Sequence, residues 1–193
     1  MKAVLISIQP KWCELIASGK KTVEVRKTKP KLETPFKCYI YCTVGKDLLT
    51  STGGEVNKLN EIVFYLTDNK KIYELNGKVI GEFVCDTFII DKTFGHDALF
   101  NAVACLSDAD AASYCLNKEM YGWHISDLVI YDEPKELSEF YHYCGDKPKC
   151  DGCEAHYFSN TECGKEDYCC SPIDGCKPLK RPPQSWCYVE ERK

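Results

Sequence analysis

The chain has 193 residues, of which 44% are hydrophobic and 28% charged, so it can bury a real core and is not intrinsically disordered. This length predicts a single domain over residues 1–193. The net charge of −4 gives by itself no reason to expect a nucleic acid partner.

The start of the chain predicts neither a signal peptide nor a membrane anchor. The apolar run at residues 3–8 is short, and Gln9 and Pro10 end it, whereas a signal peptide has a longer apolar stretch. No segment approaches the roughly 18 apolar residues of a membrane span. We therefore expect a cytoplasmic protein with no membrane contact. In a reducing compartment, clustered cysteines bind metal more often than they form disulfides.

The first part of the chain predicts three strands and one helix. Alternating apolar residues and β-branched residues favour strands at residues 2–8, 22–26 and 36–43. Pro10 suits the first turn of a helix, where its missing N–H costs nothing, and Gly19 suits the end of that helix.

The rest of the chain predicts more strands and few helices. Residues 45–77 are mostly polar and predict an elaborated loop with one strand at 62–66. Asn76 and Gly77 mark a tight turn. The elements expected after it are a long bent strand at 78–91, a helix from Ser107 to about Asn117, a strand at 123–131, a helical turn at 134–140 and a last strand at 185–190. The succession predicts an α+β fold: a small mixed β-barrel with peripheral helices, closed by the last strand.

Charge is distributed unevenly along the chain. Residues 1–50 hold ten basic and four acidic groups, and the remaining residues hold 15 basic and 25 acidic groups. Such a basic cluster can follow a phosphate backbone or hold an anionic substrate, and it can equally be a solvated face. Its members are Lys20, Lys21, Arg26, Lys27, Lys29 and Lys31.

Residues 19–26, GKKTVEVR, combine a turn with a charged strand and fit the pattern G-x-K-x-x-E-x-R. Glu24 and Arg26 are two residues apart on the predicted strand, so their side chains share a face, and Lys21 lies at the preceding turn. A lysine, a carboxylate and a guanidinium that converge can bind a polar base or an anion, or shift a pKa for proton transfer. The alternative is an ordinary surface Glu–Arg pair.

This octapeptide, placed after a strand and a helix, resembles the signature of the ASCH domain, a family with a PUA-like β-barrel fold. The arrangement resembles the larger ASCH proteins of bacteria and their phages, over about residues 1–140 and 178–192. The supporting segments are ISIQPKW, GKVIGEFVCD, WHISDLVIYDEPKELSEF and RPPQSWCYVEE.

The resemblance implies binding of RNA, or of a nucleoside or nucleotide, in a cleft lined by the signature residues. Glu82 lies between apolar neighbours and either faces this cleft as a second carboxylate or faces solvent, and Gln184 follows two prolines that fix its backbone. Trp12 is expected to lie in the core rather than to stack on a ligand. The predicted binding residues are Lys20, Lys21, Glu24, Arg26, Glu82 and Gln184.

Two other function classes remain open. One ASCH branch hydrolyses acylated cytidine with the motif lysine and a threonine, but Glu24 stands here where that threonine would be, and another branch is ribonuclease-like. If the protein is a hydrolase, Lys21 and Glu24 are the expected catalytic residues, acting by acid–base chemistry. The third class is a protein-interaction adaptor that docks partners through its cysteine-rich segment.

Half of the 14 cysteines fall between positions 144 and 176, within a predicted insert at about 141–178. Cys150 and Cys153 form a C-x-x-C pair, which can supply two thiolates to one tetrahedral metal. The insert has few large apolar residues, so a structural zinc would supply its folding energy; disulfides or a redox pair are the alternatives. The predicted zinc ligands are drawn from Cys150, Cys153, Cys163, Cys170 and Cys176.

Overall fold

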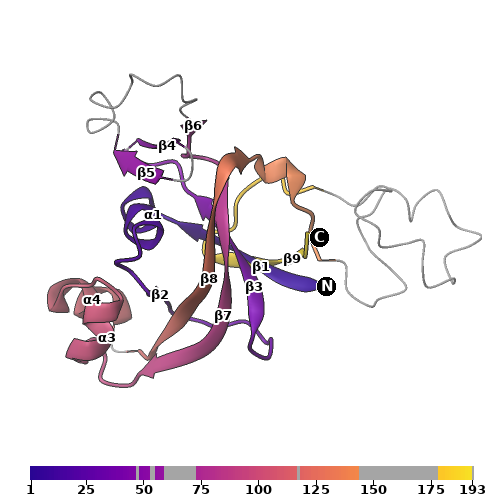
Figure 1. Ribbon diagram of the computed structural model, residues 1–193. Coiled ribbons are helices and arrows are strands. Elements are labelled where there is room, and N and C mark those ends of the chain that lie inside the picture. Colours follow the sequence, from indigo (N-terminus) through magenta and orange to yellow (C-terminus); the bar gives the residue numbers. More distant parts are fainter. Residues whose placement is uncertain (47, 53–54, 59–72, 117, 144–177, 193) are drawn as a thin grey trace, which may run out of the picture.

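A computed structural model describes residues 1–46, 48–52, 55–58, 73–116, 118–143 and 178–192 (Figure 1). The strand expected at 62–66 and the predicted zinc ligands lie outside these residues. The helices and strands are, in chain order, β1 (Lys2–Ile8), α1 (Pro10–Ala17), β2 (Val23–Arg26), β3 (Phe36–Cys42), β4 (Leu49–Thr52), β5 (Glu55–Lys58), β6 (Tyr73–Glu74), β7 (Val79–Asp91), α3 (Ala98–Val103), α4 (Asp108–Cys115), β8 (Met120–Lys135), the 3-10 helix η1 (Leu137–Glu139) and β9 (Trp186–Glu190).

The main sheet has six strands in the order β2-β8-β7-β3-β1-β9. The pair β1–β3 is parallel and the other neighbouring pairs are antiparallel. The expected mixed α+β class, with few helices, is confirmed. The long bent strand expected at 78–91 is β7, whose ladder with β8 shifts register at three places, so both strands curve strongly.

The prediction that the last strand closes a barrel is wrong. β9 pairs with β1 and forms one edge of the sheet, while β2 forms the other edge. Side chains bridge these two edges: Trp186 donates from Nε1 to Thr28 Oγ1 at 3.1 Å, and the Tyr188 hydroxyl accepts from the Lys31 amide at 2.8 Å. The curved sheet is therefore held nearly shut by side-chain hydrogen bonds where a backbone ladder was expected.

The segment expected to be one long polar loop carries a second sheet. β4 pairs with β5 and β6 in an antiparallel sheet of order β5-β4-β6, which lies beside α1 (Figure 1). Its central strand is fixed where the Leu49 amide donates to Asn76 Oδ1 at 2.9 Å. Leu49 and Leu75 are buried in the main core, so this small sheet extends the core over α1.

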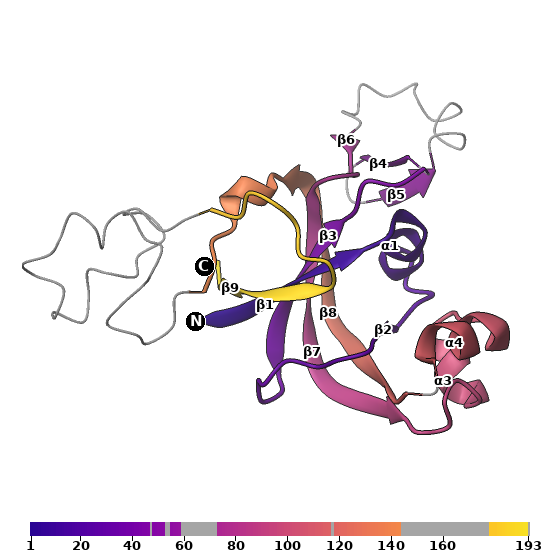
Figure 2. The ribbon, with the colours of Figure 1, turned by 180° about the vertical axis from the view of Figure 1, so that it is seen from behind.

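β1 is buried on both faces, which explains its continuous apolar run. Val4, Ile6 and Ile8 pack with α1 in the largest core cluster, while Ala3 and Leu5 pack in a second cluster on the other face of the sheet. Figure 2 shows β1 and β9 side by side, with both chain ends at the same side of the molecule.

A third core cluster joins β2 to α3 and α4, at the far end of the sheet (Figure 1). The helix expected after Ser107 is α4, and its cap is confirmed: Ser107 Oγ accepts from the Asp110 amide at 3.1 Å. α3 was not expected from the sequence; the Asp97 carboxylate caps it. Among the described helices, none is long and apolar enough to cross a membrane.

Candidate functional site

A pocket of about 360 Å³ lies where α1, β2 and α4 meet. It brings together the helix before the signature octapeptide, the strand within it and a helix almost a hundred residues later. The residues that line it are Gln9, Lys11, Trp12, Lys21, Glu24, Val25, Lys27, Leu106, Asp110, Ser113 and Tyr114.

The turn after α1 places Lys21 at the bottom of this pocket. Gly19 adopts a φ of +71°, a conformation that side-chain-bearing residues rarely take, and the chain then turns so that the Lys21 amide donates to Leu15 O at 2.9 Å. The Lys21 ammonium donates to Ala104 O at 2.6 Å. Ala104 is the C-terminal cap of α3, so the end of that helix holds the lysine in place.

Glu24 and Arg26 do share a face of β2, as the strand spacing predicts. The Arg26 Nη2 atom lies 2.9 Å from Glu24 Oε1, and the Lys21 ammonium lies 3.6 Å from Glu24 Oε2. Arg26 also donates from Nη2 to Ser7 O at 2.6 Å, and it does not line the pocket. Arg26 therefore supports the carboxylate from behind, while Lys21 and Glu24 face the pocket.

Burial sets the chemistry of this group. Lys21 is 3% exposed and Glu24 is 5% exposed. Burial lowers the pKa of Lys21 from its ordinary value, although the negative charge of Glu24 acts in the opposite direction. Such a lysine can donate hydrogen bonds when charged, and it gives up its proton more readily than a surface lysine.

Two aromatic side chains and two lysines form the upper part of the pocket. Trp12 and Tyr114 are half-buried in its wall. The Lys11 ammonium lies 4.3 Å from the centre of the Trp12 ring, and the Lys27 ammonium lies 4.9 Å from the centre of the Tyr114 ring. Trp12 packs against the core as expected, but it also presents part of its ring to the pocket.

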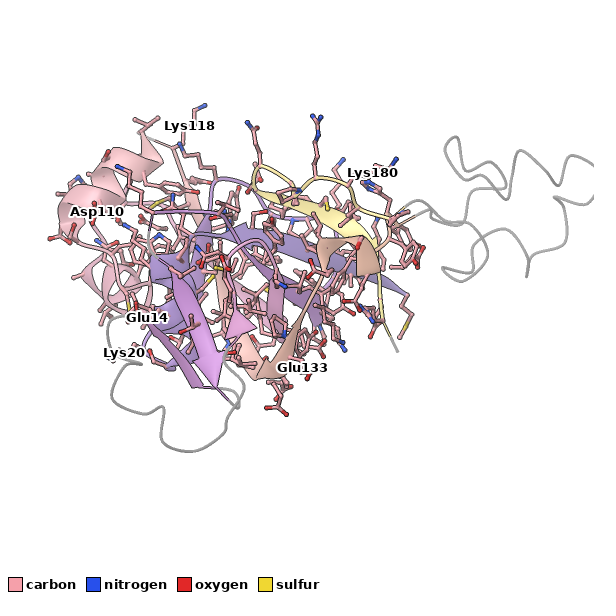
Figure 3. All side chains as sticks on the ribbon, turned by 90° about the horizontal axis from the view of Figure 1, so that it is seen from above. Glu14, Lys20, Asp110, Lys118, Glu133 and Lys180 are labelled. Carbon is pink, nitrogen blue, oxygen red and sulfur yellow. The ribbon has the colours of Figure 1, made fainter. Side chains whose placement is uncertain are left out.

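Besides Arg26, three of the predicted binding residues do not line this pocket. Lys20 is exposed, and Figure 3 shows it at the outer surface; its carbonyl accepts from the Cys105 thiol. Gln184 is also exposed and does not line the pocket. Its neighbour Pro183 contributes a carbonyl that accepts from Ser7 Oγ at 2.7 Å, so the two prolines fix the loop beside β1.

Glu82 belongs to a different polar cluster, formed by β3, β7 and β8. The Lys37 ammonium donates to Glu82 Oε1 at 2.9 Å, and the Tyr131 hydroxyl donates to Glu82 Oε2 at 2.6 Å. We refer to Lys37, Glu82 and Tyr131 as the second cluster, and to Lys21, Glu24 and Arg26 as the site cluster. Glu82 therefore does not supply a second carboxylate to the pocket; it accepts hydrogen bonds within the second cluster.

Sequence reasoning missed Tyr114, Asp110 and the Ala104 carbonyl, which come from the α3–α4 region. The carbonyl is available because α3 ends there and Cys105 takes a positive φ of 53°. No residue pattern signals that turn. A partial signal existed for α4, since its cap was predicted, but nothing in the sequence says that α4 packs over β2.

The described cysteines do not form a metal site. Among the residues that the structure describes, no group of three or more His, Cys, Asp or Glu side chains is placed to hold a metal ion. Seven cysteines of the described part are free thiols, and most are buried, where a free cysteine acts as a small hydrophobic residue.

Comparisons with known proteins agree with this fold. Residues 6–45, which include the octapeptide, match the family model of the ASCH domain. The fold resembles the crystal structure of ASCH from Zymomonas mobilis, with a TM-score of 0.55 and 16% identity over 98% of this chain and 88% of that chain. A serine-to-alanine mutant of ZmASCH gives the same TM-score and identity, with 98% and 89% covered.

A tyrosine-to-phenylalanine mutant of ZmASCH is also similar, with a TM-score of 0.50 and 19% identity over 71% of this chain and 77% of that chain. No curated protein matches significantly. The class is therefore a mixed α+β, PUA-like fold. Within that class the predicted resemblance to the ASCH domain family is confirmed, by the family model over the N-terminal segment and by the fold over most of the chain.

Proposed function

We propose that the protein binds RNA, or a free nucleoside or nucleotide, by taking one base into the pocket beside Lys21 and Glu24. The observation that carries this proposal is a buried carboxylate at the bottom of an aromatic-walled pocket with a basic rim. The volume of about 360 Å³ is at the lower end of the range for small-molecule sites and suits one nucleoside. The ASCH family match supports the same class of ligand.

Each part of the pocket suits a different part of a nucleotide. Glu24 presents a carboxylate that accepts hydrogen bonds from the amino groups of a base, and Lys21 donates to a base carbonyl. Trp12 and Tyr114 offer aromatic surface to the base ring, and such contact contributes about 1–3 kcal/mol per base. The Lys11 and Lys27 ammoniums at the rim suit a phosphate.

Binding measurements on matched lysine variants test the proposal. Wild-type protein is screened by thermal shift against nucleosides, modified nucleosides, nucleotides and short RNAs, and the affinity of the best ligand is then measured by calorimetry. Lys21→Met should weaken binding roughly ten- to hundred-fold, because a hydrogen bond to a charged group contributes about 1.5–3 kcal/mol. The control is Lys37→Met, which removes a lysine of the second cluster.

Two results would reject the pocket. One is an unchanged affinity in both Lys21→Met and Tyr114→Ala, since these variants remove the charged bottom and the aromatic wall separately. The other is an equal loss of affinity in Lys21→Met and the Lys37→Met control while both variants stay folded, since binding would then not depend on the pocket. Circular dichroism of each variant separates a local from a global effect.

Hydrolysis of an RNA bond or of an acylated pyrimidine nucleoside is the second candidate function. The lowered pKa of Lys21 favours it, because an amine that loses its proton more easily can take part in proton transfer beside the Glu24 carboxylate. Thr22 does not replace the threonine of the amidohydrolase branch, since it is exposed and does not line the pocket. Turnover that is lost in Glu24→Gln while binding persists would establish catalysis; binding without turnover in the wild type would reject it.

We also propose that the cysteine-rich insert binds one structural zinc. The proposal rests on the spacing of the cysteines, all of which lie outside the described residues. Metal analysis of protein purified under reducing conditions should give about one zinc per chain, and less than about 0.3 per chain would reject it. The candidate ligands are Cys150, Cys153, Cys163, Cys170 and Cys176.

A further inference from the structure

We infer that the ligand is a single strand of RNA, whose neighbouring phosphates lie along a row of lysines that leads away from the pocket. The inference rests on the proposed function, because it takes the pocket as the place of one nucleotide. We name the row the basic track. It consists of Lys2, Lys27, Lys29 and Lys31.

The track begins in the pocket itself. Lys27 lines the pocket, and its ammonium lies over the Tyr114 ring. The chain then continues along the outside of the sheet, where Thr28 Oγ1 accepts from Trp186 Nε1 at 3.1 Å. Figure 2 shows this segment passing from β2 toward β3, below β9.

The middle of the track lies over β7 and β8. The Lys29 ammonium lies 5.2 Å from the centre of the Phe88 ring and 5.9 Å from the centre of the Tyr121 ring. Both rings are only half-buried. The track therefore places aromatic surface directly beside a cation, which is the combination that single-stranded nucleic acid sites use.

The far end of the track lies over β9. The Lys31 amide donates to the Tyr188 hydroxyl at 2.8 Å, and the Lys2 ammonium lies 3.8 Å from the centre of the same tyrosine ring. One side chain thus fixes the positions of two track residues that are far apart in the sequence. The lysines follow one path because β7, β8 and β9 anchor them.

Three of the four track lysines have no ion-pair partner among the described acidic side chains. Within the described part of the chain, Lys27, Lys29 and Lys31 are exposed and form no ion pair, whereas Lys37 and Lys78 each pair with a glutamate. Figure 3 shows nitrogen-tipped side chains along the edge of the molecule where β9 runs, between Lys118 and Lys180, and Glu133 at the opposite edge. A row of unpaired cations is what a phosphodiester backbone requires.

The depth of the pocket selects a single strand. Glu24 is 5% exposed, so a base reaches it only after leaving any stack or base pair. A duplex would have to flip that base out at a cost of a few kcal/mol, whereas a single strand presents it freely. Residues 27–31 span at most about 14 Å. At a stacked rise of about 3.4 Å per nucleotide, that distance accommodates roughly four nucleotides.

The test compares two probes on three variants of the full chain. The probes are a random-sequence ten-nucleotide single-stranded RNA and the four ribonucleoside 5′-monophosphates, with affinities measured at several salt concentrations. Lys29→Ala/Lys31→Ala removes the track beyond the pocket, and Lys21→Met changes the pocket. The matched control is Lys78→Ala/Lys135→Ala, which removes two lysines from another part of the surface, one of them 4.5 Å from the centre of the Tyr131 ring.

We expect the wild type to bind the ten-nucleotide RNA at least about ten-fold more tightly than any monophosphate. The track variant should lose most of that advantage and bind the monophosphates with unchanged affinity. The slope of log K against log salt concentration should become less steep by about 1.4, because each of the two lost phosphate contacts to a single strand contributes about 0.7. The control should resemble the wild type.

Other outcomes separate the two proposals. Wild-type binding of the RNA no tighter than of the monophosphates, or an unchanged track variant, would overturn the single-strand inference and leave the pocket intact. RNA binding that Lys21→Met leaves unchanged would instead reject the pocket. A further probe, one ten-nucleotide RNA sequence annealed to its complement, tests the strand preference: equal affinity for this duplex and for its single strand would overturn that preference.

Discussion

The site cluster and the second cluster each contain a lysine–glutamate pair, but burial gives the two pairs different properties. In the site cluster Glu24 has a side chain 6% exposed and lies between Lys21 and Arg26. In the second cluster Glu82 has a side chain 24% exposed and accepts from Lys37 and Tyr131. Both are lysine–glutamate pairs on adjoining parts of one sheet.

The two lysines differ in the direction of their pKa shifts. Burial lowers the pKa of Lys21, while the hydrogen bond to Glu82 raises the pKa of Lys37. Burial alone would raise the pKa of Glu82, but its bonds from Tyr131 and Lys37 bring it below the usual value. In the second cluster, hydrogen bonds and partial exposure to solvent stabilise the charges. In the site cluster, the charged groups are buried at the bottom of a pocket, where a ligand can bind them.

Removing one carboxylate from each cluster gives the largest expected contrast in stability. Glu24→Gln leaves two buried cations without a countercharge and should lower the free energy of unfolding by about 3–5 kcal/mol. Glu82→Gln should cost about 1 kcal/mol or less, because Lys37 can turn to solvent. Urea unfolding monitored by circular dichroism measures both.

Equal losses in the two glutamine variants would break this comparison, since burial would then not matter. The charge-conserving variant Glu24→Asp provides a control. It keeps the negative charge and should retain more stability than Glu24→Gln, and a loss as large as that of Glu24→Gln would show that shape rather than charge is decisive.

β8 pairs with β7, which carries Glu82, and with β2, which carries Glu24. Gly122 of β8 lies where β2 packs closely against it. A Cβ at Gly122 would lie 2.6 Å from Val23 Cγ1 and 2.7 Å from Phe100 Cε2. Gly122→Ala should therefore push β2 away from β8 and cost about 1–3 kcal/mol, with weaker nucleotide binding. In the double variant with Val23→Ala, part of the loss should be recovered; strict additivity of the two losses would contradict the proposed clash.

Much of the fold was predictable because its signals are local. Strand alternation gave β1, β2, β3 and β9 to within about two residues, and Ser107 correctly indicated the start of α4. α3 was missed because its six residues show no clear amphipathic pattern. The open sheet was missed because the sequence of β9 does not show whether β9 also pairs with β2. Hydrogen bonds from single side chains, such as those of Trp186 and Tyr188, replace this pairing.

The site was predictable only where it lies within one segment. The spacing of Lys21, Glu24 and Arg26 anticipates that they meet, because a turn and a strand fix it. Glu82 was expected in the same cleft, but strand alternation states only that a residue lies on one of two faces. Tyr114 could not be anticipated, since its place depends on how α4 packs against β2.

Removing the tyrosine hydroxyl from each region should give a smaller difference in stability. The Tyr131 hydroxyl donates to Glu82, so Tyr131→Phe should lower stability by about 1 kcal/mol. The Tyr114 hydroxyl forms no hydrogen bond with the described residues, so Tyr114→Phe should change stability by less than about 0.5 kcal/mol. Thermal and urea unfolding measure both, and a larger loss for Tyr114→Phe would show that its hydroxyl has a structural partner.

The pH dependence of stability gives the finest test, because the two lysines should affect it with opposite signs. Between its lowered pKa and the ordinary value of 10.5, Lys21 is less protonated in the folded protein than in the unfolded chain, so its contribution to stability rises with pH. Lys37 keeps its proton in the folded protein above 10.5, so its contribution is present below that pH and is lost as the pH rises through the raised pKa.

Subtracting Lys→Met variants removes the contributions of titrating groups that do not interact with the substituted lysine. The stability of the wild type relative to Lys21→Met should increase as the pH rises toward 10.5, and its stability relative to Lys37→Met should decrease above that pH. If both stability differences changed in the same direction with pH, burial would not set the charge of Lys21. The physical distinction between the two clusters would then fail.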